Sequence, residues 1–221
     1  GIHGWTPVNI GAAPADDGAY DFNGTSNYIG TDYIPNISNG ATMMYWFKPN
    51  VLDKDQVMGV FHYGDRFYAG LSINQTAFFA VGNEYKSDIV ISQHLNVDEW
   101  VHITLSYDGT TAKYYINGTV VDSIVWPGET ANTSPFRIGD IDHGNDHFMN
   151  GLIRDVRVYE TTLTQDDIIN IIGNNINTVF SKDNFHGLGQ AGSLNGFRIV
   201  DEDNNEYINC AGIWQEGSSC S

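Results

Sequence analysis

The sequence predicts an all-β protein, an antiparallel β-sandwich with one short helix and a small C-terminal extension. Short runs rich in aromatic and β-branched residues recur along the chain, and Gly, Asn, Asp or Pro separate them. No helical pattern intervenes between these runs, and strands that follow one another in this way form antiparallel sandwiches or barrels. The 221 residues are 41% apolar and 13% aromatic, enough for one sizeable core or for a domain plus an appendage.

The predicted strands are 41–49, 56–64, 66–73, 76–82, 88–92, 100–108, 112–118 and 119–126. Residues 100–125 form the clearest group, a three-stranded meander with turns at Asp108-Gly109 and Asn117-Gly118. A two-residue type I′ turn needs positive φ at both central positions, which Asn, Asp and Gly tolerate best.

The first strand of this meander shows which of its faces is apolar. Its side chains alternate between two sets, and because successive residues of a strand point to opposite faces, the apolar set fixes the core face. The apolar set is Val101, Ile103, Leu105 and Tyr107, and the other set is Trp100, His102, Thr104 and Ser106.

One helix is predicted after Thr162. Thr164 has the residue type of an N-cap, and Asp166 and Asp167 follow in the first turn, where the helix dipole favours anions. Four isoleucines supply an apolar stripe before Gly173 ends the helix. We expect this helix to be structural and to plug one end of the sandwich.

The composition changes after Gly173, so the predicted division is a sandwich domain over 1–173 and an extension over 174–221. The extension is rich in Gly and Asn and contains two weak strand candidates, 196–203 and 206–214. The two cysteines of the chain, Cys210 and Cys220, lie close together in it, which favours one short-loop disulfide and an oxidising compartment over two free thiols. Because the chain starts at Gly1 rather than Met, we expect it to be a processed or excised piece.

The charge of the chain excludes several classes of partner. The formal net charge is −17, from 27 acidic and 10 basic residues. Nucleic acids and anionic membrane surfaces need cationic patches, so neither is an expected partner. No apolar run is long enough to insert into a membrane. Neutral glycans, cations and basic protein surfaces remain.

The segment 137–151 adds more negative charge to this acidic chain. Its oxygen-bearing side chains Asp140, Asp142, Asn145 and Asp146 surround Gly144. Calcium takes six to eight oxygen ligands at about 2.3–2.6 Å, and such a cation would offset the mutual repulsion of these carboxylates. A solvated acidic loop without an ion is the alternative. Zinc on the two histidines of this segment is disfavoured, because a third ligand is missing.

Several segments together resemble the laminin G-like and pentraxin-like branch of the concanavalin A-like lectin/glucanase superfamily, a jelly-roll fold. The matching pieces are GIHG (1–4), AYDFNGTSNYI (19–29), EWVHITLSYDGTTAKYYINGTVV (99–121), FRIGD (136–140) and FMNGLIRDVRVYETTLTQDDI (148–168). In pentraxin-like members a loop in the position of 140–146 carries calcium ligands, and an earlier loop supplies another acid. The resemblance therefore implies a calcium site made of Asp65, Asp140, Asp142, Asn145 and Asp146.

The strands do not show the signature of an enzyme. Glycanases of this broad fold need two carboxylates about 5–10 Å apart on one sheet face, and no strand here has acids alternating along it. There is also no Gly-x-Ser-x-Gly elbow and no nucleophilic cysteine motif. We therefore expect a non-catalytic protein.

The leading hypothesis is an extracellular, cell-surface or virion-surface recognition module that binds a glycan or glycoprotein, with calcium stabilising its loop. Stacking on sugar rings requires aromatic side chains with polar groups beside them. The candidates are Trp126, Tyr63, Phe67 and His143, and Trp126 is the one expected to be exposed. The alternative is a structural or adhesive component of a capsid, fibre, pilus or surface layer that contacts other copies or a scaffold protein.

Overall fold

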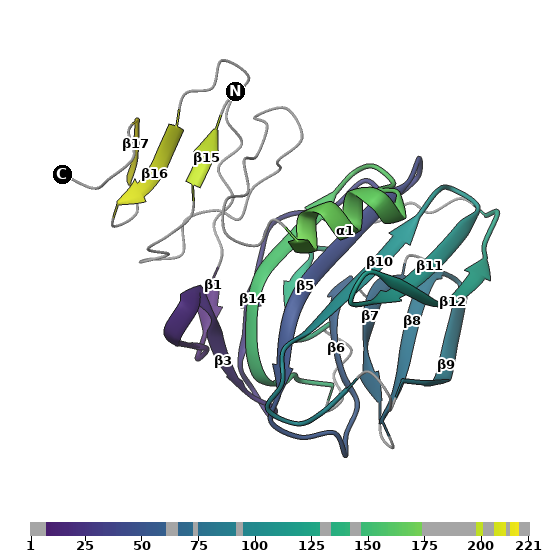
Figure 1. Cartoon of the computed structure of the whole chain (residues 1–221), viewed down its shortest axis with the longest axis horizontal. Helices are drawn as coiled ribbons and strands as arrows, with labels where there is room; N and C mark the ends of the chain where they lie inside the picture. The colour runs from purple at the N-terminus through teal and green to yellow at the C-terminus, as the bar shows by residue number, and fades with distance from the viewer. Residues whose placement is uncertain are drawn as a thin grey trace.

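The structure is a computed structural model, and it describes residues 8–60, 66–72, 75–91, 95–128, 134–141, 147–173, 198–200, 206–210 and 213–216. The chain folds as predicted into an antiparallel β-sandwich of jelly-roll type, in which two seven-stranded sheets face each other (Figure 1). Among the described residues, no helix is long and apolar enough to cross a membrane.

Sheet A has the strand order β1-β4-β13-β6-β7-β8-β9. Its strands are β1 (Val8–Ile10), β4 (Tyr28–Gly30), β13 (Arg137–Ile138), β6 (Gln56–Val60), β7 (Arg66–Ser72), β8 (Thr76–Gly82) and β9 (Glu84–Val90). The strand predicted at 88–92 starts earlier, at Glu84, and a register shift in its pairing with β8 accommodates Asp88 at a positive φ of 58°.

Sheet B has the strand order β12-β11-β10-β5-β14-β3-β2. Its strands are β12 (Thr119–Val125), β11 (Thr111–Ile116), β10 (Val101–Tyr107), β5 (Ala41–Pro49), β14 (Asn150–Tyr159), β3 (Tyr20–Asn23) and β2 (Ala13–Pro14). A short 3₁₀ helix, η1 (Asp16–Gly18), connects β2 to β3. Sheet B thus contains the predicted meander as β10, β11 and β12.

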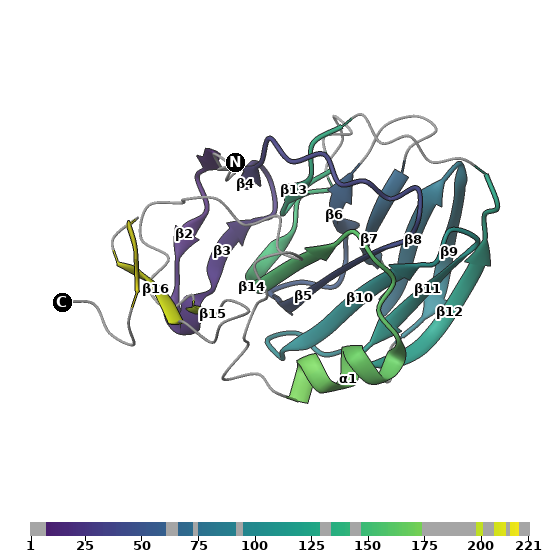
Figure 2. The same ribbon diagram turned by 90° about the horizontal axis from the view of Figure 1, so that it is seen from above.

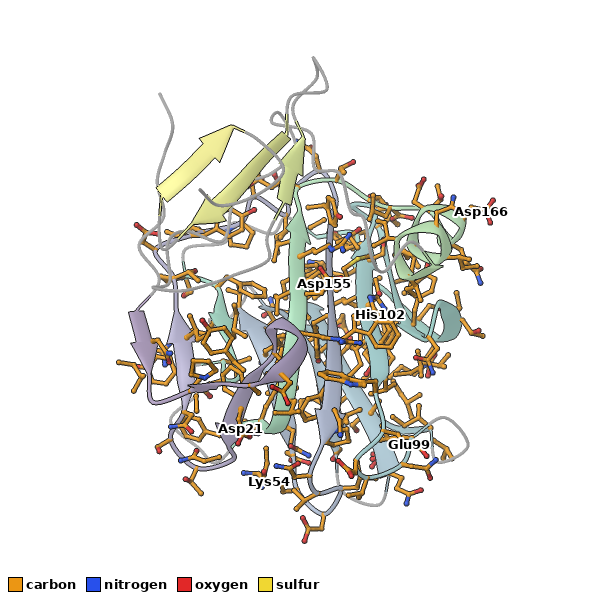
Figure 3. The ribbon with its side chains drawn as sticks, turned by 60° about the vertical axis from the view of Figure 1, so that its left-hand side comes forward. Asp21, Lys54, Glu99, His102, Asp155 and Asp166 are labelled. Carbon is orange, nitrogen blue, oxygen red and sulfur yellow. The ribbon has the colours of Figure 1, made fainter. Side chains whose placement is uncertain are left out.

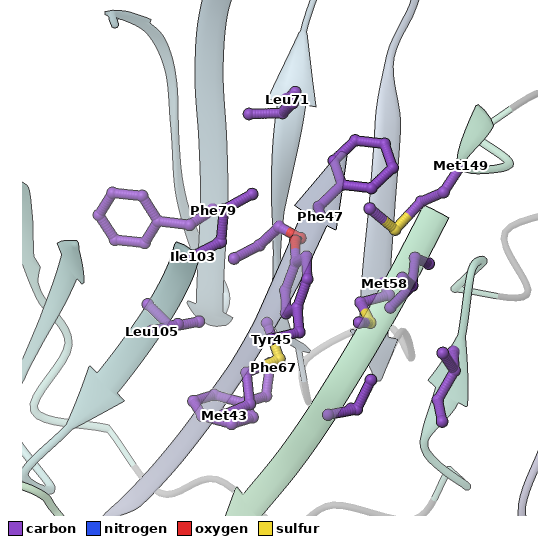
Figure 4. Close-up of a cluster of buried hydrophobic side chains, with 14 of the residues drawn as sticks. Met43, Tyr45, Phe47, Met58, Phe67, Leu71, Phe79, Ile103, Leu105 and Met149 are labelled. Atoms are coloured by element: carbon purple, nitrogen blue, oxygen red, sulfur yellow. The ribbon is translucent and has the colours of Figure 1, made fainter. Parts of the chain in front are cut away.

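The inward side chains of both sheets make one core. Val101, Ile103, Leu105 and Tyr107 of β10 belong to it, as their alternation predicts. Figure 4 shows Met43, Tyr45 and Phe47 of β5 among Phe67, Leu71 and Phe79 from sheet A. Fully burying a side chain of this size stabilises the fold by about 1.5–3 kcal/mol.

The two meander turns differ from each other. Asn117 and Gly118 both have positive φ, 49° and 78°, as the type I′ prediction requires. The Asp108-Gly109 prediction is wrong in detail, because three residues separate β10 from β11 and Asp108 does not have positive φ. Instead, Asp108 Oδ1 accepts the backbone N–H groups of Thr110 and Thr111, so its side chain holds the turn.

The predicted helix is α1 (Gln165–Gly173), and its cap is the predicted Thr164. Thr164 Oγ1 accepts the N–H of Asp167 at 3.2 Å, and Asp167 Oδ2 accepts the N–H of Thr164 at 2.9 Å, an arrangement equivalent to a capping box. The expected location of the helix is wrong. Ile168 packs on Met44 and Tyr115, so α1 covers part of the outer face of sheet B (Figures 1 and 2).

The extension contributes a three-stranded antiparallel sheet of β15 (Arg198–Val200), β16 (Glu206–Cys210) and β17 (Ile213–Glu216). Both predicted strand segments are present, and the second is divided into two strands. Cys210 ends β16, whereas Cys220 lies outside the described residues, so the disulfide stays a prediction.

Candidate functional site

Most of the predicted calcium ligands lie outside the described residues: Asp65, Asp142, Asn145 and Asp146. Asp140 is described, and its side chain is already paired. It follows β13, is only 4% exposed, and its Oδ2 lies 3.2 Å from Nη1 of Arg137. The Arg137 guanidinium carbon in turn lies 4.5 Å from the ring centroid of Tyr28. The charge of Asp140 therefore has a counter-charge in the protein itself.

Both ends of the acidic loop are anchored on the outer face of sheet A. Ile141 packs in a buried cluster with Val57, Tyr68 and Phe78, and the His147 ring lies 6.4 Å from that of Phe78. The backbone N–H of Val57 donates to the His147 carbonyl at 3.1 Å. Tyr68 and Phe78 are buried by these contacts, so they do not offer open rings beside the loop. Among the described residues, no three His, Cys, Asp or Glu side chains are grouped closely enough to hold a metal ion.

The predicted sugar-binding residues have different environments. Phe67 is 0% exposed and lies in the core between the sheets (Figure 4), so its assignment as a stacking residue is wrong. Trp126 is half-buried and packs against the core, with its indole next to the backbone of Gly82 and Gly128. It is less open than expected from its place beside Pro127. Tyr63 and His143 lie outside the described residues.

Two tryptophans and two basic residues lie on the outer face of sheet B, beyond the part that α1 covers. They are Trp46 and Lys48 of β5, Trp100 just before β10, and Arg154 of β14, and we call these four residues the tryptophan face. Trp46 pairs with Arg154 on one side and with His102 on the other. Phe47 pairs with Val101, so the next residues along the same two strands, Lys48 and Trp100, are also neighbours. Figure 3 looks onto this side of sheet B, where His102 and Asp155 are labelled.

Arg154 connects the two indoles. Its guanidinium carbon lies 4.2 Å from the ring centroid of Trp100 and 5.8 Å from that of Trp46. Both are within the range in which a cation is attracted to an aromatic face. Lys48 Nζ lies 2.8 Å from Oδ1 of Asp98. Asp98 is at the border of the face, and its side chain is 74% exposed. The indoles and Arg154 are half-buried, so the face combines partly open aromatic rings with planar and charged polar groups.

Trp46 is the residue with an unusual environment. Its ring meets the His102 ring edge to face, with centroids 5.1 Å apart. Its Nε1 is buried and has no hydrogen-bond partner in the described part of the chain. Leaving such a donor unsatisfied costs about 1–3 kcal/mol and is uncommon in native proteins. Internal contacts therefore do not fully satisfy the polar groups of this face.

A buried polar cluster lies beside the tryptophan face. Arg157 is 3% exposed and donates to both carboxylate oxygens of Asp155, from Nε at 2.6 Å and from Nη2 at 2.7 Å. Asp155 adopts a φ of 51° at a bulge in β14, which turns its carboxylate toward Arg157. His102 is 1% exposed, and burial together with the nearby charge of Arg157 lowers its pKa to about 3. His102 is therefore neutral at ordinary pH.

Two carboxylates beside the tryptophan face are held in ion pairs. Asp98 is paired with Lys48, and Asp155 with Arg157.

Comparisons with known proteins agree with this architecture. A laminin G-like family model, described as the concanavalin A-like lectin/glucanases superfamily, matches residues 23–169, more than half of the chain. The receptor-binding domain of a botulinum neurotoxin C/D mosaic serotype is similar in structure, with a TM-score of 0.61 and 15% identity over 78% of this chain and 47% of that one. The binding domain of serotype D gives the same values.

A further structure of serotype D, its ligand-binding domain in complex with N-acetylneuraminic acid, has a TM-score of 0.59 and 14% identity over 78% of this chain and 46% of that one. The chain thus spans about half the length of these toxin domains, and identities this low show a shared fold only. The family model, the order of the strands and the two-sheet architecture lead to the same conclusion: the chain belongs to the concanavalin A-like lectin/glucanase superfamily.

Proposed function

We propose that this protein is a non-catalytic, extracellular carbohydrate-binding module and that the tryptophan face is its sugar-binding site. The observation that carries the proposal is the meeting of Trp46 and Trp100 on the outer side of sheet B with Arg154 between them. Indoles offer apolar ring faces on which the C–H faces of sugars stack, and arginine and aspartate side chains bind hydroxyl groups through planar arrays of donors and acceptors.

Two further observations support this function. Family membership gives a lectin-like fold, although fold alone does not determine activity. Similar jelly rolls occur in receptor-binding domains, and one of these structures holds N-acetylneuraminic acid. A glycan or glycoprotein at a cell or virion surface is accordingly the proposed partner.

We also propose that calcium binds the acidic loop on the opposite sheet and orders it. The residues that would hold the ion are Asp142, Asn145 and Asp146, with Asp65 from the segment just before β7. Asp140 is less suited to the role than the sequence predicts, because Arg137 already neutralises it. Carboxylate and amide oxygens are the ligands that calcium prefers, and the loop is closed at its base by the hydrogen bond from Met149 N to Gly139 O at 2.9 Å. The ion would shape the loop and would take no part in a reaction.

A glycan array tests the proposed function with three proteins: wild type, Trp100→Ala and Tyr85→Ala. Tyr85 is the matched control, since it is an exposed aromatic residue on sheet A, away from the tryptophan face. Wild type and Tyr85→Ala should bind the same glycans, and Trp100→Ala should lose at least tenfold in affinity. Absence of binding by the wild-type protein would reject the proposal and favour the structural or adhesive role.

A further inference from the structure

We infer that the tryptophan face selects neutral sugars with two adjacent free hydroxyl groups, and that the ion pair of Lys48 and Asp98 beside Trp100 recognises this vicinal diol. The inference rests on the proposed function, since it names the class of sugar that the same site binds. The net charge of −17 indicates a neutral glycan only in general terms, whereas the ion pair specifies which groups of the sugar are bound.

The first argument is the bonding capacity that Lys48 and Asp98 retain. Nζ of Lys48 lies 2.8 Å from Oδ1 of Asp98, and in the described part of the chain neither side chain takes part in another hydrogen bond or ion pair. A lysine ammonium has three donors, and an ionised carboxylate has about four acceptor positions. Because the Asp98 side chain is mostly exposed, the pair keeps most of this capacity for a ligand.

The second argument is the match between this ion pair and a diol. A sugar hydroxyl both donates and accepts hydrogen bonds, so one of two neighbouring hydroxyls can donate to the carboxylate while the other accepts from the ammonium. Neighbouring hydroxyl oxygens on a sugar ring are about one hydrogen-bond length apart, as are Nζ and Oδ1. Hydrogen bonds to charged groups are stronger than those between neutral groups. A diol therefore bridges the pair without breaking it.

The third argument is that the backbone holds the pair in place before a ligand binds. Asp98 has a φ of 64°, and its N–H donates to the Pro49 carbonyl at 2.8 Å. Pro49 directly follows Lys48 at the end of β5, so this hydrogen bond ties together the segments of the two partners. Leu95, three residues before Asp98, is buried in the core. A site that is already ordered loses little conformational freedom on binding, and this raises affinity.

The fourth argument is that acids border the face. Asp21 is exposed on β3 and lies two strands from Lys48, since it pairs with Leu152 and Leu152 pairs with Lys48. Two strand spacings amount to about 10 Å, which is within the screening length at about 0.1 M salt. Glu99 directly precedes Trp100, and Figure 3 labels both acids on this side of sheet B. A carboxylate on the sugar is therefore repelled from this site, whereas a neutral sugar is not.

The basic residues on this side of sheet B do not outweigh its acids. Lys48 and Arg157 each pair with an aspartate, and Lys54 stands between two aspartates in the chain. This leaves the guanidinium of Arg154, which is packed against the indoles, beside the two bordering acids. The face is thus slightly acidic, like the chain as a whole, and an acidic sugar has no electrostatic advantage there.

The first experiment needs no variant of the protein. An array presents glycans that end in glucose, galactose or mannose, their uronate counterparts, which differ only by a carboxylate, and sialylated glycans. It also presents forms of the neutral glycans in which each hydroxyl of the terminal sugar is replaced in turn by hydrogen. Wild type should bind a neutral glycan at least about twofold tighter than its uronate counterpart. Loss of either of two adjacent hydroxyls should weaken binding about tenfold or more, and loss of any other hydroxyl should have little effect.

Variants then test whether the ion pair is the group that reads the diol. Asp98→Gly removes the carboxylate and suits the positive φ of this position, so it does not strain the backbone. Lys48→Met removes the ammonium and keeps an unbranched side chain. The control is Asp122→Asn, which breaks the ion pair with Lys86 between the edge strands β12 and β9. Asp98→Gly and Lys48→Met should each bind the neutral glycan about tenfold or more weakly, and the control should bind it as wild type does.

Several results would overturn the inference and leave the proposed function standing, with Trp100→Ala still losing affinity. These are tighter binding of uronate or sialylated glycans than of neutral ones, a loss confined to one hydroxyl or spread evenly over all of them, and unchanged affinity of Asp98→Gly. Binding of no glycan by the wild-type protein would reject both the inference and the proposed function.

Discussion

Lowering the pH from 7 to 5 should destabilise the fold through one side chain, His102. This imidazole is 1% exposed, and its pKa falls to about 3, first because of burial and second because of the charge of Arg157. In the unfolded chain a histidine has a pKa of about 6.5. The unfolded state therefore binds more protons than the folded state over the window between these two values.

The sign and size of the effect follow from linkage. The stability contributed by neutral His102 is fully present above about pH 6.5 and is lost as the pH falls toward 3. At pH 5 the unfolded histidine is almost fully protonated and the folded one is not, which costs about 2 kcal/mol relative to pH 7. For a domain of this size the midpoint of thermal unfolding should fall by about 4–8 °C from this group alone.

Urea unfolding followed by tryptophan fluorescence, at pH 7 and at pH 5, measures this loss. The other histidines and the carboxylates also titrate, so the comparison is with His102→Gln, which keeps a polar group that can contact Thr104. The variant should be less stable than wild type at pH 7 but should lose about 2 kcal/mol less on acidification. Equal losses for the two proteins would refute the reasoning and would mean that His102 titrates as in the unfolded chain.

Three further predictions concern the core, the helix and the acidic loop. Phe67→Ala should destabilise the protein by about 3–5 kcal/mol in urea unfolding, because a buried ring is removed; a selective loss of sugar binding at unchanged stability would instead restore its predicted stacking role. Thr164→Ala should cost about 1 kcal/mol by removing the cap of α1, and a Thr164→Ser variant should retain most of that stability. Calcium at a hundredfold excess over its dissociation constant should raise stability by about 2.7 kcal/mol, and a chelator or Asp142→Asn/Asp146→Asn should remove this gain. Asp140→Asn should instead cost about 2 kcal/mol even in chelator, because it breaks the pair with Arg137; a midpoint that does not respond to calcium would reject the ion.

The sandwich could be predicted because its strands carry strong local signals. The strand Val101–Tyr107 alternates between apolar and other residues, and its apolar set lies in the core. Thr164 and the acids after it give the start of α1 from local chemistry alone. The place where the helix packs depends on which sheet face its isoleucines meet, and that is a tertiary property the sequence pattern does not contain.

Two differences at the candidate site have physical reasons. Phe67 is predicted as a stacking residue because it lies near a candidate loop, although its face of β7 is fixed by alternation with Tyr68 and points into the core. The prediction of Asp140 as a calcium ligand comes from its residue type and from the position of its segment in pentraxin-like proteins, and it does not take a nearby counter-charge into account. A partner for it, Arg137, stands only three residues earlier.

The tryptophan face was missed because its members are far apart in sequence. The outward positions of β5 alternate with Met43, Tyr45 and Phe47, so the outward direction of Trp46 was visible in the sequence. The meeting of Trp46 with Trp100 and Arg154 depends on the pairing of β5 with β10 on one side and β14 on the other. That strand order is set by the jelly-roll topology and not by any local motif.

The most direct test of the proposed binding site observes the indoles themselves. The chain has five tryptophans, and selective ¹⁵N labelling gives one indole N–H resonance for each. Titration with the sugar selected on the array should shift or broaden the signals of Trp46 and Trp100, assigned by single Trp→Phe variants, and should leave that of Trp126 unchanged. A shift confined to Trp126, or saturation binding without any change at Trp46 and Trp100, would contradict the assignment of the tryptophan face as the site.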